Sequence, residues 1–115
     1  MDILVAEDNR DVFMDIKRTL ERSISGVKVS TWPGQGGIDS AGLVIVDLEH
    51  NASDEILSGL KTRPGVPVIL LADHNGSAER LIGALDAGAD DYLYKPLDKI
   101  ELQERVKATL WEARQ

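Results

Sequence analysis

The chain has 115 residues, of which 43% are hydrophobic and 29% charged, and its formal net charge is -7. These values predict one globular domain with its own core, and the acidic balance argues against nucleic-acid binding by this domain. Cysteine is absent, which excludes disulfides and thiolate zinc sites. Because no apolar run reaches membrane-spanning length and no signal-type segment precedes the first strand, we expect no membrane association and a cytoplasmic location.

Short apolar runs alternate with helical patterns along the chain, which is typical of βαβ units and a parallel sheet. Strands are predicted over residues 3–6, 27–32, 43–46, 68–71 and 91–94. Helices are predicted from the N-cap Asn9 to Gly26, from Ser53 to the breakers Gly65 and Pro67, over 77–87, and over 98–114. After the turn at 33–37, residues 38–42 are too few for a crossover helix, so the second helix should be short or absent.

Four charged residues fall where predicted strands end: Glu7 and Asp8 after the first strand, Asp47 after the third and Lys95 after the fifth. The carboxyl ends of parallel strands lie at one edge of an open α/β sheet, so we expect one shared cavity. Three carboxylates repel one another until a cation enters, and Mg²⁺ prefers oxygen ligands of this kind. This strand-end cluster therefore predicts a metal-assisted phosphoryl acceptor.

Four segments together resemble the receiver domain of bacterial two-component response regulators. They read ILVAEDN at 3–9, LVIVDL at 43–48, PVILL at 67–71 and AGADDYLYKP at 87–96. The resemblance covers essentially the whole chain and implies a single receiver domain over 1–115, which can be one part of a longer protein. It also implies a doubly wound, flavodoxin-like α/β fold whose five parallel strands have the order 2-1-3-4-5.

The resemblance implies a role for each acidic residue. Asp47 would accept the phosphoryl group. Asp8 and Asp47 would ligate Mg²⁺ directly, Glu49 would offer its backbone carbonyl, and Glu7 would act on the metal through water or from the second position. Such a domain assists only its own phosphorylation and dephosphorylation, so we do not expect an enzyme.

Lys95 and Pro96 complete the implied site. Lys95 would pair with the phosphoryl oxygens, a task that suits a compact ammonium on a flexible stem. Pro96 matches the family's cis-proline position, where the peptide bond orients the lysine. The expected partners are a sensor histidine kinase or phosphotransfer protein, a downstream output domain, and a second copy of the chain in a homodimer.

The fourth strand departs from the family pattern. Ala72 stands where the family has Thr or Ser, and Asp73 follows where a small residue is usual. In the family, that hydroxyl and a swinging aromatic residue, here Tyr92, couple phosphorylation to the surface formed by the helix over 77–87, the fifth strand and the last helix. Ala72 cannot form that hydrogen bond, so ordinary switching is in doubt.

Simpler explanations exist for single residues. Taken alone, Asp8 can be only an N-cap, and Lys95 can be a solvated loop residue. His50 and His74 are expected to be exposed loop histidines, because two histidines without further ligands make no convincing metal site. The glycine-rich turn at 34–37 lacks the Lys and Ser/Thr of a phosphate-binding loop.

Two functions therefore stay open. The first is a receiver that accepts phosphate on Asp47 and relays the signal through the surface described above. The second is a pseudo-receiver, a phosphorylation-independent interaction module. The strand-end cluster favours the first, because a purely structural module needs no such concentration of charge. Ala72, Asp73 and the shortened second helix favour the second.

Overall fold

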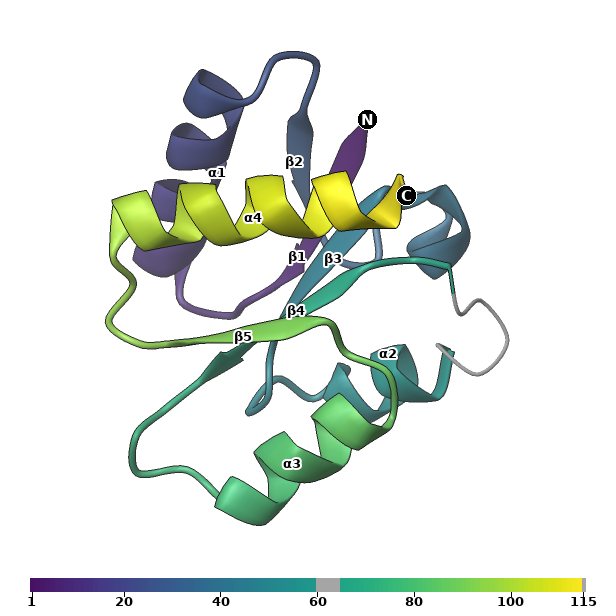
Figure 1. The fold of residues 1–115 in the computed structure, drawn as a ribbon, viewed down its shortest axis with the longest axis vertical. Helices are drawn as coiled ribbons and strands as arrows, with labels where there is room; N and C mark the ends of the chain where they lie inside the picture. Colours follow the sequence, from purple (N-terminus) through teal and green to yellow (C-terminus); the bar gives the residue numbers. More distant parts are fainter. Residues whose placement is uncertain (60–64, 115) are drawn as a thin grey trace.

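The computed structural model describes residues 1–59 and 65–114, which form a five-stranded sheet covered by helices (Figure 1). Every pair of neighbouring strands is parallel, and the order β2-β1-β3-β4-β5 confirms the predicted topology. The strands are β1 Asp2–Ala6, β2 Lys28–Thr31, β3 Leu43–Asp47, β4 Val68–Ala72 and β5 Asp91–Tyr94. The helices are α1 Arg10–Ser23, α2 Ser53–Gly59, α3 Ala78–Asp86 and α4 Lys99–Ala113.

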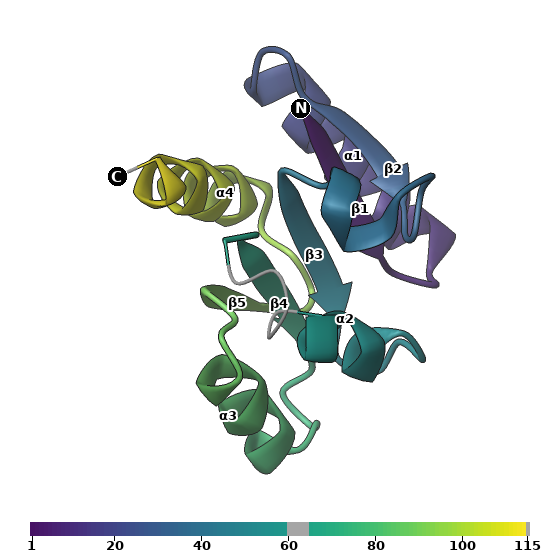
Figure 2. The same cartoon turned by 90° about the vertical axis from the view of Figure 1, so that its right-hand side faces the viewer.

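The helices cover both faces of the sheet. Helices α1 and α4 lie on one face, and α2 and α3 lie on the other (Figures 1 and 2). Each face has its own apolar cluster, the first built around Ile16, Leu20 and Val106 and the second around Ile56 and Leu81. Every residue of β3 and β4 is buried, as expected of central strands with helices on both sides.

Three of the four α-helices in the described residues begin at a side-chain cap, and the predicted cap Asn9 is one of them. The Asn9 side chain accepts hydrogen bonds from the backbone N–H groups of Asp11 and Val12, at 3.0 and 3.1 Å. Ser77 caps α3 and Asp98 caps α4 in the same way. Each cap stabilises its helix by about 1 kcal/mol. The cap on α1 also holds the loop that follows β1, which carries two of the predicted site residues.

The connection between β2 and β3 contains no α-helix in the described residues, only a single 3₁₀ turn, η1 (Gly37–Ser40). This confirms the prediction of a short or absent second helix. The turn begins at Gly37 with a φ of 56°, a left-handed conformation that glycine adopts without strain. Ile38 packs against the cluster on the α2 side, so the turn closes this end of the core in place of a helix.

The helix predicted from Ser53 is seen as α2 up to Gly59. Its expected course through 60–64 lies outside the described residues. No helix in the described part of the chain has the length and apolar content that a membrane span requires.

Candidate functional site

The ends of β1, β3 and β5 bring three charged side chains into contact. Lys95 Nζ lies 2.7 Å from Asp47 Oδ2 and 2.5 Å from Glu7 Oε1. The three side chains are largely buried, with 2% of Glu7, 11% of Asp47 and 18% of Lys95 exposed. Asp47 and Glu7 precede Lys95 by 48 and 88 positions, yet both contact its ammonium group. The parallel topology explains this, because it brings the ends of the three strands to one edge of the sheet.

The two carboxylates keep Lys95 charged. Burial by itself would lower the pKa of the Lys95 ammonium, but the contacts with Asp47 and Glu7 outweigh it and raise that pKa. Two carboxylates on one ammonium leave an excess of negative charge at the centre. The site therefore holds a charged ammonium beside two carboxylates whose combined charge it only half balances.

Backbone groups of the loops after β1 and β3 hold the two carboxylates. Asp47 Oδ1 accepts a hydrogen bond from the Glu49 N–H at 3.0 Å, and Glu7 Oε2 accepts one from the Asn9 N–H at 3.0 Å. Glu7 Oε1 is buried and has no hydrogen bond of good geometry; its close contact is the ion pair with Lys95. Each carboxylate is thus oriented from both sides before any ligand arrives.

Asp8 has a different neighbour. Its side chain is 81% exposed, and its Oδ1 lies 3.2 Å from Nε2 of His50, whose side chain is only 13% exposed. His50 Nδ1 accepts the Ala52 N–H at 3.0 Å, which orients the ring so that Nε2 faces the Asp8 carboxylate. The prediction that His50 is an exposed loop residue was wrong. The sequence signal was its place three residues after Asp47, at the sheet edge where Asp8 also lies.

The fit of the site to Mg²⁺ depends on its oxygen atoms. Among the residues that the structure describes, no three acidic or histidine side chains lie together as a ready metal-binding group. The carboxylates of Asp8 and Asp47 and the Glu49 carbonyl are nevertheless the hard oxygen ligands that Mg²⁺ prefers. Glu7 adds a buried oxygen without a hydrogen bond. These oxygen atoms are of the type that Mg²⁺ binds. The exposed Asp8 side chain faces His50 instead of the other oxygen atoms.

The end of β4 carries no charged contact to the site. Ala72 is 5% exposed, and it borders a small cavity of about 70 Å³ whose wall also includes Leu48, Arg80 and Tyr94. The predicted switch residue Tyr92 is 37% exposed and packs edge-on against Tyr94 at 5.5 Å between ring centroids. The structure thus places Ala72 beside the acceptor strand and Tyr92 on the surface.

His74 is exposed, as predicted, but it is not isolated. Its ring stacks on Tyr94, with 4.2 Å between centroids and 16° between planes. With Glu49, Asp73 and Lys95 it lines an open hollow over the strand ends, of about 470 Å³. This hollow connects Lys95 to solvent.

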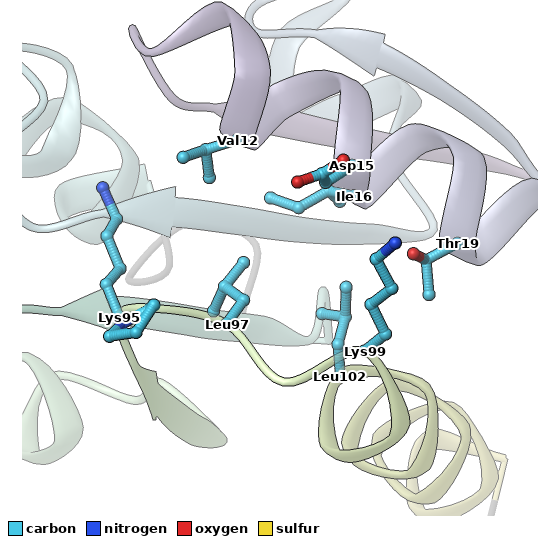
Figure 3. A pocket seen from close by; sticks show the side chains of 9 residues that line it. Val12, Asp15, Ile16, Thr19, Lys95, Leu97, Lys99 and Leu102 are labelled. Atoms are coloured by element: carbon cyan, nitrogen blue, oxygen red, sulfur yellow. The ribbon is translucent and has the colours of Figure 1, made fainter.

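A second cavity, of about 170 Å³, lies between α1 and the segment that leads into α4 (Figure 3). Its walls are mainly apolar and include Val12, Leu97 and Leu102, with the stem of Lys95 at one end. The Lys95 Nζ points away from Leu97 and Leu102 (Figure 3). The Lys95–Pro96 peptide bond beside it is cis. Neither Glu7 nor Asp47 lines this cavity, so it is separate from the cluster of charged side chains at the strand ends.

The sequence matches the family described as response regulator receiver domain over residues 3–107. The response regulator ArlR of Staphylococcus aureus is 32% identical over 118 residues, which cover 94% of this chain and 52% of ArlR. The chain therefore spans about half the length of this curated relative.

Solved structures agree with this match. The receiver domain protein (CheY-like) of Methanospirillum hungatei JF-1 is similar with a TM-score of 0.82 and 26% identity, over 98% of this chain and 95% of that one. A receiver domain protein from Clostridium thermocellum is similar with a TM-score of 0.81 and 26% identity, over 98% and 96% of the two chains.

Proposed function

The chain belongs to the response regulator receiver domain family, and we propose that it accepts a phosphoryl group on Asp47 in two-component signal transduction. The observation that carries this proposal is the environment of the Asp47 carboxylate. It lies at the end of a central strand, between Lys95 Nζ at 2.7 Å and the Glu49 N–H at 3.0 Å. A carboxylate oriented in this way, next to a fixed cation, is suited to in-line attack on phosphorus.

In the proposed reaction an Asp47 oxygen forms a bond to the phosphorus of the donor, and the bond from phosphorus to its leaving group breaks. Lys95 is already charged and in contact with Asp47, so it can follow the phosphoryl oxygens without a change of protonation. Glu7 holds the ammonium at the site throughout. When bound, Mg²⁺ would neutralise negative charge, held by Asp8, Asp47 and the Glu49 carbonyl with help from Glu7.

The proposed phosphoryl donors are a sensor histidine kinase or a phosphotransfer protein. The proposed relay surface is formed by α3, β5 and α4, where Ile82, Tyr92 and Trp111 are exposed at 58%, 37% and 65%. Exposed large apolar side chains on neighbouring elements are typical of a contact surface. An output domain or a second copy of this chain would bind to this surface. The domain would work in the cytoplasm. It would assist only its own phosphorylation and dephosphorylation and act on no further substrate.

A second candidate is a phosphorylation-independent interaction module. The observation that favours it is Ala72, whose methyl group borders the cavity next to Leu48 and offers no hydroxyl to a phosphoryl group. In that case the relay surface would bind its partner equally well with and without phosphate.

Intact-mass measurement after treatment with acetyl phosphate and Mg²⁺ tests the proposal. We expect one labile phosphate on the native domain and none on Asp47→Asn. Asp86→Asn is the control, because Asp86 is an exposed carboxylate at the end of α3 and does not line the hollow over the strand ends, and it should be labelled like the native domain. An adduct that persists in Asp47→Asn would locate the chemistry elsewhere. An unlabelled native domain would favour the interaction module.

A further inference from the structure

Arg80, in the first turn of α3, reaches across to the loop that follows the acceptor strand. Its Nη2 donates to the backbone carbonyl of Leu48 at 2.5 Å and to Ser53 Oγ at 2.8 Å. Asp54 is 3.9 Å away, but its side chain is 87% exposed, so that ion pair contributes little. The hydrogen bond to the Leu48 carbonyl thus links α3 to this loop.

The Leu48 carbonyl belongs to the same peptide unit as the Glu49 N–H. Because a peptide unit is planar, a donor that holds the carbonyl oxygen also sets the direction of the N–H at the other end. That Glu49 N–H donates to Asp47 Oδ1 at 3.0 Å. A cation on the carbonyl oxygen also polarises the peptide and strengthens its N–H as a donor. One peptide unit thus joins the Arg80 guanidinium to the Asp47 carboxylate.

The other side of Leu48 is held by the sheet, since the Leu48 N–H donates to the Leu71 carbonyl at 3.0 Å. The orientation of the peptide unit between Leu48 and Glu49 is therefore set by the hydrogen bonds of its carbonyl and of its N–H. Arg80 is the partner at the carbonyl end, and its guanidinium keeps its charge at any physiological pH.

We propose that Arg80 is a positioning residue for Asp47 and connects the acceptor to α3, a connection that Ala72 cannot make. The inference rests on the proposed function, because the positioned group is the proposed phosphoacceptor. Arg80 and Ala72 line the same small cavity, so the guanidinium lies beside the place where a hydroxyl is missing. A change of charge or geometry at Asp47 would alter its hydrogen bond with the Glu49 N–H and thereby shift the peptide unit between Leu48 and Glu49. Arg80, which binds the carbonyl of that unit, would carry the shift to the first turn of α3.

The first test needs no phosphorylation. Amide NMR and hydrogen exchange of Glu49 are compared in the native domain, Arg80→Ala, Arg80→Lys and Arg105→Ala. We expect the Glu49 amide to shift and to exchange roughly tenfold faster in Arg80→Ala, as for loss of a charged hydrogen bond. Arg80→Lys should restore part of the protection. Arg105 is the matched control, since it is similarly exposed at 49% and is ion-paired with Asp91.

The second test measures labelling by acetyl phosphate, which should be roughly tenfold slower in Arg80→Ala, a change equivalent to about 1.4 kcal/mol. Beryllofluoride with Mg²⁺ should also shift the Leu81 and Ala84 amides in the native domain and no longer in Arg80→Ala. A Glu49 amide identical in the native domain and Arg80→Ala would overturn the inference. If the native domain takes up no phosphate, the proposed function fails, and the Glu49 amide still decides the role of Arg80.

Discussion

The ends of β3 and β4 are neighbours in the sheet and differ sharply in chemistry. At the end of β3, Asp47 is buried and bound by Lys95 and the Glu49 N–H. At the end of β4, Ala72 is buried without a polar group, and Asp73 is exposed. In the proposed function, acceptance of phosphate would depend on the end of β3, whereas the missing hydroxyl belongs to the end of β4.

The reason lies in how each end is stabilised. The carboxylates of Glu7 and Asp47 share the ammonium of Lys95, so removal of the lysine leaves both carboxylates buried without a cation. In contrast, no buried charge in the described part of the chain depends on a hydroxyl at position 72 for its neutralisation. An alanine at this position leaves no buried side-chain donor or acceptor without a partner.

The largest effect is expected from Lys95→Met. The variant leaves Glu7 and Asp47 buried without a cation, which should destabilise the domain by on the order of 3 kcal/mol at neutral pH. Urea unfolding measures this loss, with Lys99→Met as the control because Lys99 is exposed. Equal stability of the two variants would show that the buried ion pairs contribute nothing.

The same variant should change the dependence of stability on alkaline pH. The folded-state pKa of Lys95 is raised, so its contribution is complete below the unfolded value of about 10.4 and is lost as the pH rises through the folded value. The native domain should therefore lose stability above that pH more steeply than Lys95→Met. Parallel curves for the two proteins would contradict the raised pKa.

The next effect concerns Mg²⁺. Asp8→Asn should weaken Mg²⁺ binding about tenfold, equivalent to about 1.4 kcal/mol, because one of the proposed carboxylate ligands is lost. Amide NMR of Asp8 and Asp47 during titration with Mg²⁺ measures the affinity. Asp11→Asn, in the first turn of α1, controls for the loss of a nearby charge. Amides that stay unmoved in the native domain at about 10 mM Mg²⁺ would count against the site.

A smaller effect is expected from Ala72→Thr. The added hydroxyl can donate to the phosphoryl group, which is worth about 1 kcal/mol, so beryllofluoride should shift the α3 and Tyr92 amides further than in the native domain. Ala72→Val has nearly the shape of the Thr variant without the hydroxyl and serves as the control. If Ala72→Val responds as strongly as Ala72→Thr, filling the cavity is the cause and the hydroxyl is not.

The smallest effect is expected from Arg105→Ala. Its ion pair with Asp91 at 3.1 Å is partly exposed, with 49% of the Arg105 side chain in contact with solvent, and surface pairs of this kind stabilise a protein by about 0.2–1 kcal/mol. Thermal unfolding should show this small loss, while labelling by acetyl phosphate stays unchanged. A marked drop in labelling would mean that the β5 and α4 surface influences acceptance, contrary to the separation of the two strand ends.

The sequence alone determined the elements and the place of the chemistry. Alternating apolar runs and helical patterns predicted the strands and the helical ranges, and Asn9 was predicted as the N-cap of the first helix, because these signals come from residues a few positions apart. The meeting of Asp47 with Lys95 was also predictable, since a parallel topology brings strand ends to one edge. The connection over 33–42 was too short for a helix on length alone.

Only the tertiary structure decided how individual side chains are paired. Asp8 lies against the largely buried His50 and not beside Lys95, and Arg80 reaches a carbonyl 32 positions away. Neither contact follows from a periodic pattern, because each depends on how two loops and one helix end pack together. The tertiary packing determines which hydrogen-bond donors and acceptors are buried. Each buried group must then be paired with a neighbouring group, and the packing also determines which neighbours are close enough.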